Sequence, residues 1–191
     1  INNTPNSLTK GCLVLMQDLK SIILISAVLA LGVGMGSAEN LVKTQSWSYI
    51  ADTVMGGVSE GSAGYVEDGA SIRLIGTVST KNNGGFIQVR TSMAPVGSNG
   101  KKGIRIQVKG NNEIYNIHLR TGSSRLPWQY YAAEFIAPDN WVTIELPFSN
   151  FKKSSTRMKT NMDPTSLKSL GVVAYGRDYT ADILIKKIEL Y

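Results

Sequence analysis

Apolar and polar residues alternate along most of the chain after Leu41, and this two-residue period predicts β-strands. The segment 104–109 shows the period most clearly, because three aliphatic residues alternate there with three polar ones. One apolar and one polar face are typical of an antiparallel sheet with one side in solvent. Eight or nine short strands are predicted in total, among them 71–78, 86–90, 104–109, 115–119, 129–136, 141–146, 172–175 and 183–191.

The connecting segments carry the residues expected in turns and loops. Residues 95–102 are rich in Gly, Ser and Asn, and the polar stretch 151–161 is interpreted as a mobile loop. Asp163 as N-cap and Pro164 at the first helical position predict one helical turn that ends near Leu170. No sustained helical period appears elsewhere after Leu41.

The last predicted strand changes phase in its middle. Ile183 and Ile185 are out of phase with Ile188 and Leu190, which predicts a β-bulge between the two pairs. Short strands of this number and spacing predict an all-β sandwich. A length of 191 residues is enough for one domain with a buried core. Periodicity alone does not distinguish one sandwich topology from another.

Two glycine pairs mark the connections near the start of this domain. The segment 47–59 leaves one strand and enters another, and the segment 82–86 repeats the pattern with a second pair. Such glycines indicate positive φ angles or close backbone packing. We expect the Asp52 carboxylate to accept backbone N–H bonds in the turn at the first pair. The motif residues expected to have structural roles are Asp52, Met55, Gly56, Gly57, Ser59, Asn83, Gly84, Gly85 and Phe86.

These motifs resemble the complex I intermediate-associated protein 30 family, whose hallmarks are Asp-x-Val-Met-Gly-Gly-x-Ser followed by Asn-Gly-Gly-Phe. Further agreement comes from 110–121, 141–151 and 163–171, so the resemblance covers about residues 47–191. It implies a galactose-binding-domain-like jelly roll. It also implies a non-catalytic binding module, which in mitochondrial relatives acts as a chaperone-like assembly factor for incompletely assembled subunits of respiratory complex I.

The N-terminal part has the features of an export signal. Residues 17–20 form a short polar region with one cationic side chain, 21–35 are uncharged and apolar, and 36–38 are small. We therefore expect residues 1–15 to be upstream translated sequence, 16–38 a signal peptide and 39–191 the domain. A retained membrane anchor at 21–38 is the alternative. The expected location is periplasmic or secreted, which conflicts with assembly of the cytoplasmic arm of complex I.

Composition and charge exclude several kinds of site and partner. Cys12 is the one cysteine and precedes residues 39–191, so the expected domain has no disulfide, Cys-ligated metal or cysteine nucleophile. The net charge is +6, but the paired lysines are scattered along the chain. Nucleic-acid binders gather such residues on one face, so no nucleic-acid partner is expected. Contact with a membrane is expected only through an uncleaved N-terminal segment.

Catalytic and metal-binding residues are sparse. His118 is the one histidine, so a site with several imidazoles is excluded and a Ser-His-Asp triad would need this residue. We interpret His118 as a histidine on a solvated strand face and keep a hydrolase as an alternative. Nothing in the sequence brings Asp52 and Glu134 together as a catalytic pair. No cofactor is predicted, although Asp52, Asp68 and Asp182 are candidates for a structural calcium site without a spacing motif.

The polar faces of the predicted strands suggest a binding surface. Side chains of this kind can hold a sugar by stacking and hydrogen bonds, or an anion through two arginines, or they can simply be solvated. The expected partner is a protein, such as a respiratory-complex subunit, or an envelope or extracellular glycan bound as by a carbohydrate-binding module. The candidate ligand-binding residues are Gln88, Arg90, Asn116, His118, Arg120, Trp128 and Tyr130.

Overall fold

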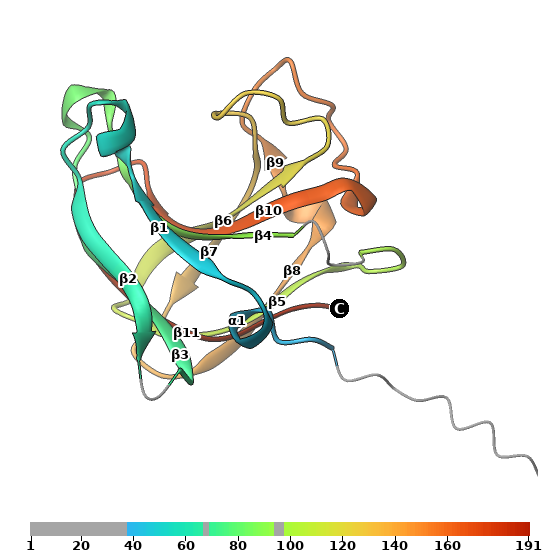
Figure 1. The fold of residues 1–191 in the computed structure, drawn as a ribbon, viewed down its shortest axis with the longest axis horizontal. Coiled ribbons are helices and arrows are strands. Elements are labelled where there is room, and N and C mark those ends of the chain that lie inside the picture. The colour runs from blue at the N-terminus through green and yellow to red at the C-terminus, as the bar shows by residue number, and fades with distance from the viewer. Residues whose placement is uncertain (1–37, 67–68, 94–97) are drawn as a thin grey trace, which may run out of the picture. The chain divides into compact units, whose positions relative to one another are not determined.

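The computed structural model describes residues 38–66, 69–93 and 98–191 as two antiparallel β-sheets packed face to face (Figure 1). Residues 16–37 of the expected signal peptide, and Cys12, lie outside the described residues. The described chain is a jelly-roll sandwich, as the alternating pattern and the family resemblance predicted. No helix within these three ranges is long and apolar enough to cross a bilayer.

Sheet A has six strands, and its order separates strands that are neighbours in sequence. All of its pairings are antiparallel, with β10 between β4 and β6. Across the sheet, the strands are β1 (Trp47–Ala51), β4 (Phe86–Ser92), β10 (Leu167–Tyr175), β6 (Glu113–Thr121), β7 (Tyr131–Ala137) and β9 (Lys152–Lys153).

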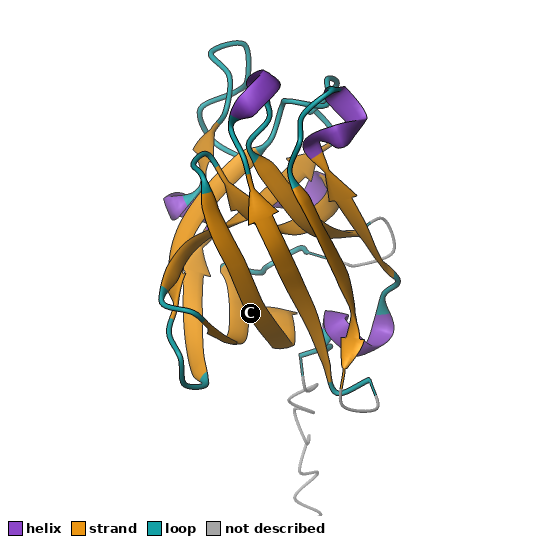
Figure 2. Ribbon diagram, turned by 90° about the vertical axis from the view of Figure 1, so that its left-hand side faces the viewer, coloured by secondary structure: helices purple, strands orange, loops and turns teal. Residues whose placement is uncertain are grey.

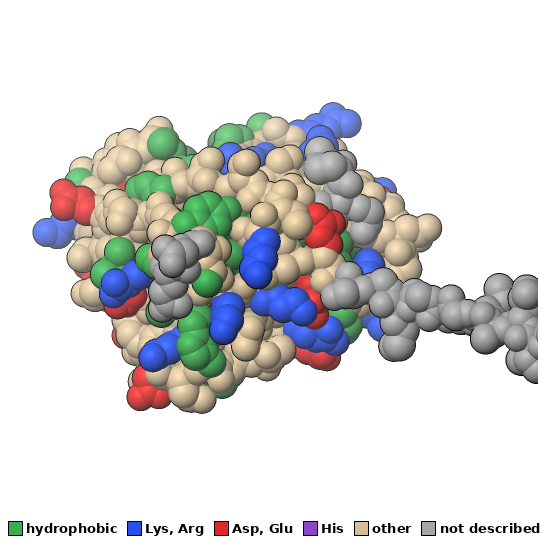
Figure 3. Space-filling view, turned by 60° about the horizontal axis from the view of Figure 1, so that its bottom comes forward, with side chains coloured by type: hydrophobic (Ala, Val, Ile, Leu, Met, Phe, Trp, Pro, Cys, Tyr) green, Lys and Arg blue, Asp and Glu red, His purple; other side chains and the backbone are tan. Residues whose placement is uncertain are grey.

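Sheet B has five strands and forms the second layer. On the side that carries it, Lys and Arg side chains are interspersed with Asp and Glu (Figure 3). Its strands, in spatial order, are β2 (Glu60–Val66), β3 (Ser71–Val78), β11 (Tyr179–Leu190), β5 (Gly103–Gly110) and β8 (Val142–Pro147).

The core lies between the sheets and is built from the apolar side of each alternation. Ile104, Ile106 and Val108 of β5 are fully buried, as their spacing predicted. Tyr115 of β6 is also fully buried, and its hydroxyl is hydrogen-bonded. It donates to the Asn111 side chain and accepts from the backbone N–H of Asp182, so burial leaves no unsatisfied polar group there.

Short helical elements connect the strands. The turns η1 and η2 lie together at one end of the sandwich, and α1 lies toward the other end (Figure 2). Asp163 caps η4 through a hydrogen bond from the N–H of Thr165, as predicted. The elements are α1 (Leu41–Thr44), η1 (Asp52–Met55), η2 (Lys81–Asn83), η3 (Phe148–Asn150) and η4 (Pro164–Ser166).

Three predictions of local structure need correction. The described residues form eleven strands instead of eight or nine. The helical turn after Asp163 ends at Ser166, because residues 167–175 pair with both β4 and β6. The segment 151–161 is also held more firmly than a mobile loop. Met158 is buried, and the Tyr131 hydroxyl donates to the carbonyl of Lys159.

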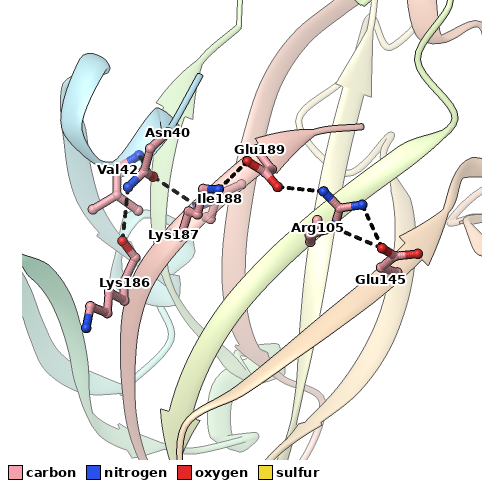
Figure 4. A network of polar contacts seen from close by, with 8 residues as sticks. All are labelled: Asn40, Val42, Arg105, Glu145, Lys186, Lys187, Ile188 and Glu189. Atoms are coloured by element: carbon pink, nitrogen blue, oxygen red, sulfur yellow. Dashed lines mark hydrogen bonds and ion pairs between the residues drawn. The ribbon is translucent and has the colours of Figure 1, made fainter. Parts of the chain in front are cut away.

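The predicted bulge in the last strand is confirmed, and it anchors the start of the domain. The register of β11 against β5 shifts between Ile185 and Lys187. The Asn40 amide donates to the carbonyl of Lys186 and accepts from the N–H of Ile188, at 3.2 Å each (Figure 4). The same side chain caps α1 by accepting from the N–H of Val42. Thus one side chain provides hydrogen-bond partners for backbone groups of both the bulge and the first turn of the helix.

An ion-pair network lies beside this anchor on sheet B (Figure 4). Arg105 pairs with Glu145 and with Glu189 at 2.7 Å each, and Lys187 pairs with Glu189 at 2.6 Å. Glu189 is nearly buried, so its charge requires these partners. Hydrogen bonds from Lys187 and Arg105 outweigh the opposing effect of burial and lower the pKa of Glu189.

Candidate functional site

Asp52 joins the two glycine motifs. Its buried carboxylate accepts hydrogen bonds from the N–H and hydroxyl of Ser59 and from the N–H groups of Gly85 and Phe86. The donors therefore differ from those predicted in the Gly56–Gly57 turn. Burial acts to raise the pKa of Asp52, but the bonds from Gly85, Ser59 and Phe86 outweigh it and lower that pKa.

The glycines next to Asp52 are explained by lack of space. A Cβ atom at Gly57 would lie 2.8 Å from the Asp52 Cβ, and one at Gly84 would lie 2.8 Å from the Asp52 Cγ. Gly56 and Gly85 instead have φ angles of +89° and +126°, which disfavour L side chains. The two motifs thus form one structural clamp around the Asp52 carboxylate. Met55 differs, because its side chain is exposed beside that of Val54.

The outer face of sheet A, meaning its surface away from sheet B, carries most of the predicted ligand-binding residues. Gln88 and Arg90 come from β4, and Asn116, His118 and Arg120 come from β6, with β10 between them. Asn116 is almost buried and offers little surface to a ligand. Loops rise on both sides of this face in Figure 1.

An aromatic cluster lies in the middle of this face. The rings of His118 and Tyr130 stack with 3.9 Å between centroids and 12° between planes. Tyr175 meets both rings edge-on, at 5.5 Å from His118 and 6.4 Å from Tyr130. Burial lowers the pKa of His118 to about 3, so the ring is neutral at pH 7. Burial, and then the adjoining Tyr175 hydroxyl, raise the pKa of Tyr130.

Gly171 of β10 has no side chain and lies between Arg90 on β4 and the aromatic cluster at His118 on β6. It is the register partner of Arg90 on one side and of His118 on the other. A Cβ atom here would lie 2.9 Å from Oε1 of Gln88, so the Gln88 amide extends over the glycine. A larger residue would displace that amide and fill the space between the cation and the aromatic cluster.

Beyond Gly171, the face opens into a hollow of about 510 Å³. Arg90, Arg120 and Lys168 contribute cationic side chains to its lining, and serines contribute hydroxyl groups. One guanidinium nitrogen of Arg120 donates to the carbonyl of Leu126 at 3.0 Å, whereas its Nε atom is buried without a hydrogen-bond partner. We name this region the basic hollow.

Trp128 lies in the loop between β6 and β7, and its side chain is 60% exposed. The hydroxyl of Ser154 donates to the Trp128 carbonyl at 2.7 Å and accepts from the N–H of Tyr130. The backbone of this loop is therefore fixed although the indole is free to contact a ligand. Gly171 and Lys168 were missed by the sequence analysis because this strand was predicted to begin only at residue 172. Tyr175 was missed because the sequence did not show that the strand lies between β4 and β6.

The carboxylates considered for catalysis or calcium are engaged elsewhere. Asp52 directly follows β1 at one edge of sheet A and Glu134 lies on β7, with β4, β10 and β6 between these two strands. Asp182 forms an ion pair with Arg73 at 2.7 Å, and Asp68 lies outside the described residues. Within the described part of the chain, no group of three or more His, Cys, Asp or Glu side chains is arranged to hold a metal ion.

The two packed antiparallel sheets form a jelly roll, a fold that solved carbohydrate-binding modules share. One solved structure, the family 11 carbohydrate-binding module from Clostridium thermocellum with a β-1,3-1,4-mixed-linked tetrasaccharide, is 16% identical. The match covers 75% of this chain and 87% of that one, with a TM-score of 0.62. The family 11 module of the cellulase Lic26A-Cel5E from the same organism is 18% identical, with coverages of 82% and 89% and a TM-score of 0.60.

The family itself is shown by sequence. The model of the family described as complex I intermediate-associated protein 30 matches residues 36–183. The chain therefore belongs to this family, and the resemblance drawn from the glycine motifs is confirmed. A comparison with curated protein sequences gave no match.

Proposed function

We propose that residues 39–191 form a non-catalytic binding module whose outer face of sheet A binds a glycan chain. The observation that carries this proposal is the aromatic cluster of His118, Tyr130 and Tyr175 beside exposed hydrogen-bonding groups on one continuous face. Aromatic rings stack on the apolar faces of sugars, and amide and guanidinium groups bind sugar hydroxyls. Tyr175 is 46% exposed and Trp128 60% exposed, so both can make such contacts.

The shape of the face also suits an extended ligand. The polar and aromatic residues follow β4 and β6 for most of their lengths, and strands of seven to nine residues span about 20–30 Å. The structure with the mixed-linked tetrasaccharide shows that a jelly roll of this kind can hold an oligosaccharide. At 16% identity it supports the fold of this chain, whereas the proposed ligand rests on the residues of the outer face.

The proposed location is outside the cytoplasm, where a glycan ligand would be met. It rests on the sequence of residues 16–38, which has the polar, apolar and small-residue regions of a signal peptide. Expression of the full chain with a C-terminal reporter, followed by N-terminal sequencing of the exported product, tests both cleavage after Ala38 and location.

To identify the ligand, binding affinity is measured by affinity electrophoresis and calorimetry for a panel of soluble β-glucans and envelope polysaccharides. We expect Tyr175→Ala and Trp128→Ala each to weaken binding by about tenfold, because each removes a stacking surface. Trp141→Ala is the matched control, since Trp141 is also partly exposed but lies directly before β8 of sheet B. Equal loss in all three variants, or binding to no glycan, would contradict the proposal.

A second candidate function is the chaperone-like assembly role associated with the family. The observation that favours it is the apolar tip of the clamp, where Val54 is 71% and Met55 62% exposed beside Val58. Exposed apolar groups of this kind can contact a protein partner. Co-purification of respiratory-complex subunits that is lost in a Val54→Ser, Met55→Ser variant, with glycan binding unchanged, would support this role instead.

A further inference from the structure

Within the described residues, the arginines of the basic hollow lack the ion pairs that three other arginines of the domain form. Arg73, Arg105 and Arg177 each pair with a carboxylate of a neighbouring strand or turn. For Arg90, Arg120 and Lys168, no carboxylate of the described chain lies within 4.0 Å. Three cationic groups therefore line one hollow without a protein counter-charge.

The fold holds the Arg120 guanidinium in the hollow without a carboxylate partner from the described chain. One of its terminal nitrogens is fixed by the carbonyl of Leu126, while its buried Nε atom has no acceptor. Burial, and then the nearby positive charge of Arg90, lower the pKa of Arg120 from its ordinary value. A buried donor without an acceptor and two adjacent like charges are both unfavourable in the absence of an anion.

Hydroxyl groups complete the set of donors. Ser48 is next to Arg90 in the β1–β4 register, and Ser169 is next to Arg120 in the β10–β6 register. Ser124 lines the same hollow from the loop after β6. Guanidinium groups with flanking hydroxyls match the geometry of carboxylate and sulfate oxygens, and a volume of about 510 Å³ can accept a sugar-sized group.

We infer that the basic hollow binds the acidic group, a carboxylate or sulfate, of a glycan lying along the outer face of sheet A. This inference rests on the proposed function and narrows its ligand class to acidic glycans. Gly171 lies between the hollow and the aromatic cluster, because its register partners are Arg90, which lines the hollow, and His118 of the cluster. A sugar stacked on the cluster would place the acidic group of a neighbouring unit near the arginines.

The test uses calorimetry with two probes that share a backbone, a galacturonate hexamer and its fully methyl-esterified form. We expect the acidic hexamer to bind about tenfold more tightly at low salt, and the difference to shrink as salt is added. Arg90→Gln should remove this preference, so that the two hexamers bind with equal affinity. Arg120→Gln and Lys168→Gln should also reduce the preference for the acidic hexamer. Arg157→Gln is the charge-matched control, because Arg157 is exposed and does not line the hollow.

A second arm separates failure of the inference from failure of the proposed function. Inorganic sulfate is titrated against the full chain at constant ionic strength, and the side-chain N–H signals of Arg90 and Arg120 are followed by NMR. Saturable shifts with no binding of any glycan would retain the anion site and reject the glycan ligand.

Equal affinity for the two hexamers, or a preference that survives in Arg90→Gln, would overturn the inference while leaving glycan binding intact. Oligoglutamate that binds at the hollow more tightly than the acidic hexamer would overturn the assignment to a glycan and point to an acidic protein.

Discussion

The carboxylate of Asp52 accepts a hydrogen bond from the backbone N–H of Gly85 at 2.5 Å, although 33 residues separate them. This bond connects the turn after β1 with the turn before β4, so each family motif holds the other in place. The clamp stabilises the fold and does not bind a ligand, because hydrogen-bond donors of the chain itself surround its carboxylate.

Asp52→Asn is expected to destabilise the domain by about 3 kcal/mol, because the amide cannot accept all four bonds and leaves buried N–H groups unpaired. The free energy of unfolding from urea titration at pH 7 measures this effect. Asp139→Asn, at an exposed turn, is the control and should change the stability by less than about 0.5 kcal/mol. A loss in Asp52→Asn no greater than in the control would contradict the role of the clamp.

The same carboxylate predicts a pH dependence. The pKa of Asp52 is lowered by folding, so its ionised form stabilises the fold above the unfolded-state value of about 3.9. This contribution is lost as the pH falls from about 4 towards the folded-state pKa. The wild-type protein should therefore lose more stability than Asp52→Asn below pH 4, and parallel unfolding curves in acid would reject the interpretation.

Steric exclusion around Asp52 predicts the effects of alanine at three glycines. Gly57→Ala and Gly84→Ala should each destabilise by about 2 kcal/mol or more, since the new methyl group overlaps the Asp52 side chain. Gly64→Ala is the matched control, because a Cβ atom there has no neighbour within 4 Å. Thermal unfolding should therefore separate the first two variants from the third, whereas equal melting temperatures would show that the clamp can relax.

These motifs also show how far the sequence could predict the structure. The alternation in 71–78 and 104–109 reflects burial of one side of each strand, so both strands and their core faces were predictable. The partner of Asp52 was not, because Gly85 approaches it only through the pairing of β1 with β4. Nothing local to the sequence encodes that pairing.

The candidate site was predictable in part for the same reason. Alternation placed Gln88 and Arg90 on one side of a strand and His118 and Arg120 on one side of another. It did not reveal that β10 lies between these strands, and therefore Gly171 and Tyr175 were missed. The stacking of His118 on Tyr130 likewise depends on the β6–β7 pairing, so a histidine expected on a solvated face is largely covered.

His118 gives a second pH dependence, in a different window. Its folded-state pKa of about 3 lies below the unfolded value of about 6.5, so below pH 6.5 the unfolded state binds the proton more readily. Stability should fall by about 2 kcal/mol between pH 8 and pH 5. His118→Phe keeps a ring against Tyr130 and should flatten this dependence, as measured by urea unfolding at each pH; an unchanged slope would contradict the buried neutral imidazole.

Asn40 offers a test of where the folded domain begins. Its side chain caps α1 and also bonds to Lys186 and Ile188 at the β11 bulge, which places it two residues after the proposed cleavage site at Ala38. Asn40→Ala should destabilise by about 2 kcal/mol, from the lost cap and the unpaired groups of the bulge. Glu39→Ala is the control, because Glu39 is exposed and precedes the cap. Amide hydrogen exchange should show faster exchange at Val42 and Ile188 in Asn40→Ala alone; if both amides stay protected, the domain boundary lies after this anchor and the packing of Leu41 and Val42 holds the N-terminus without it.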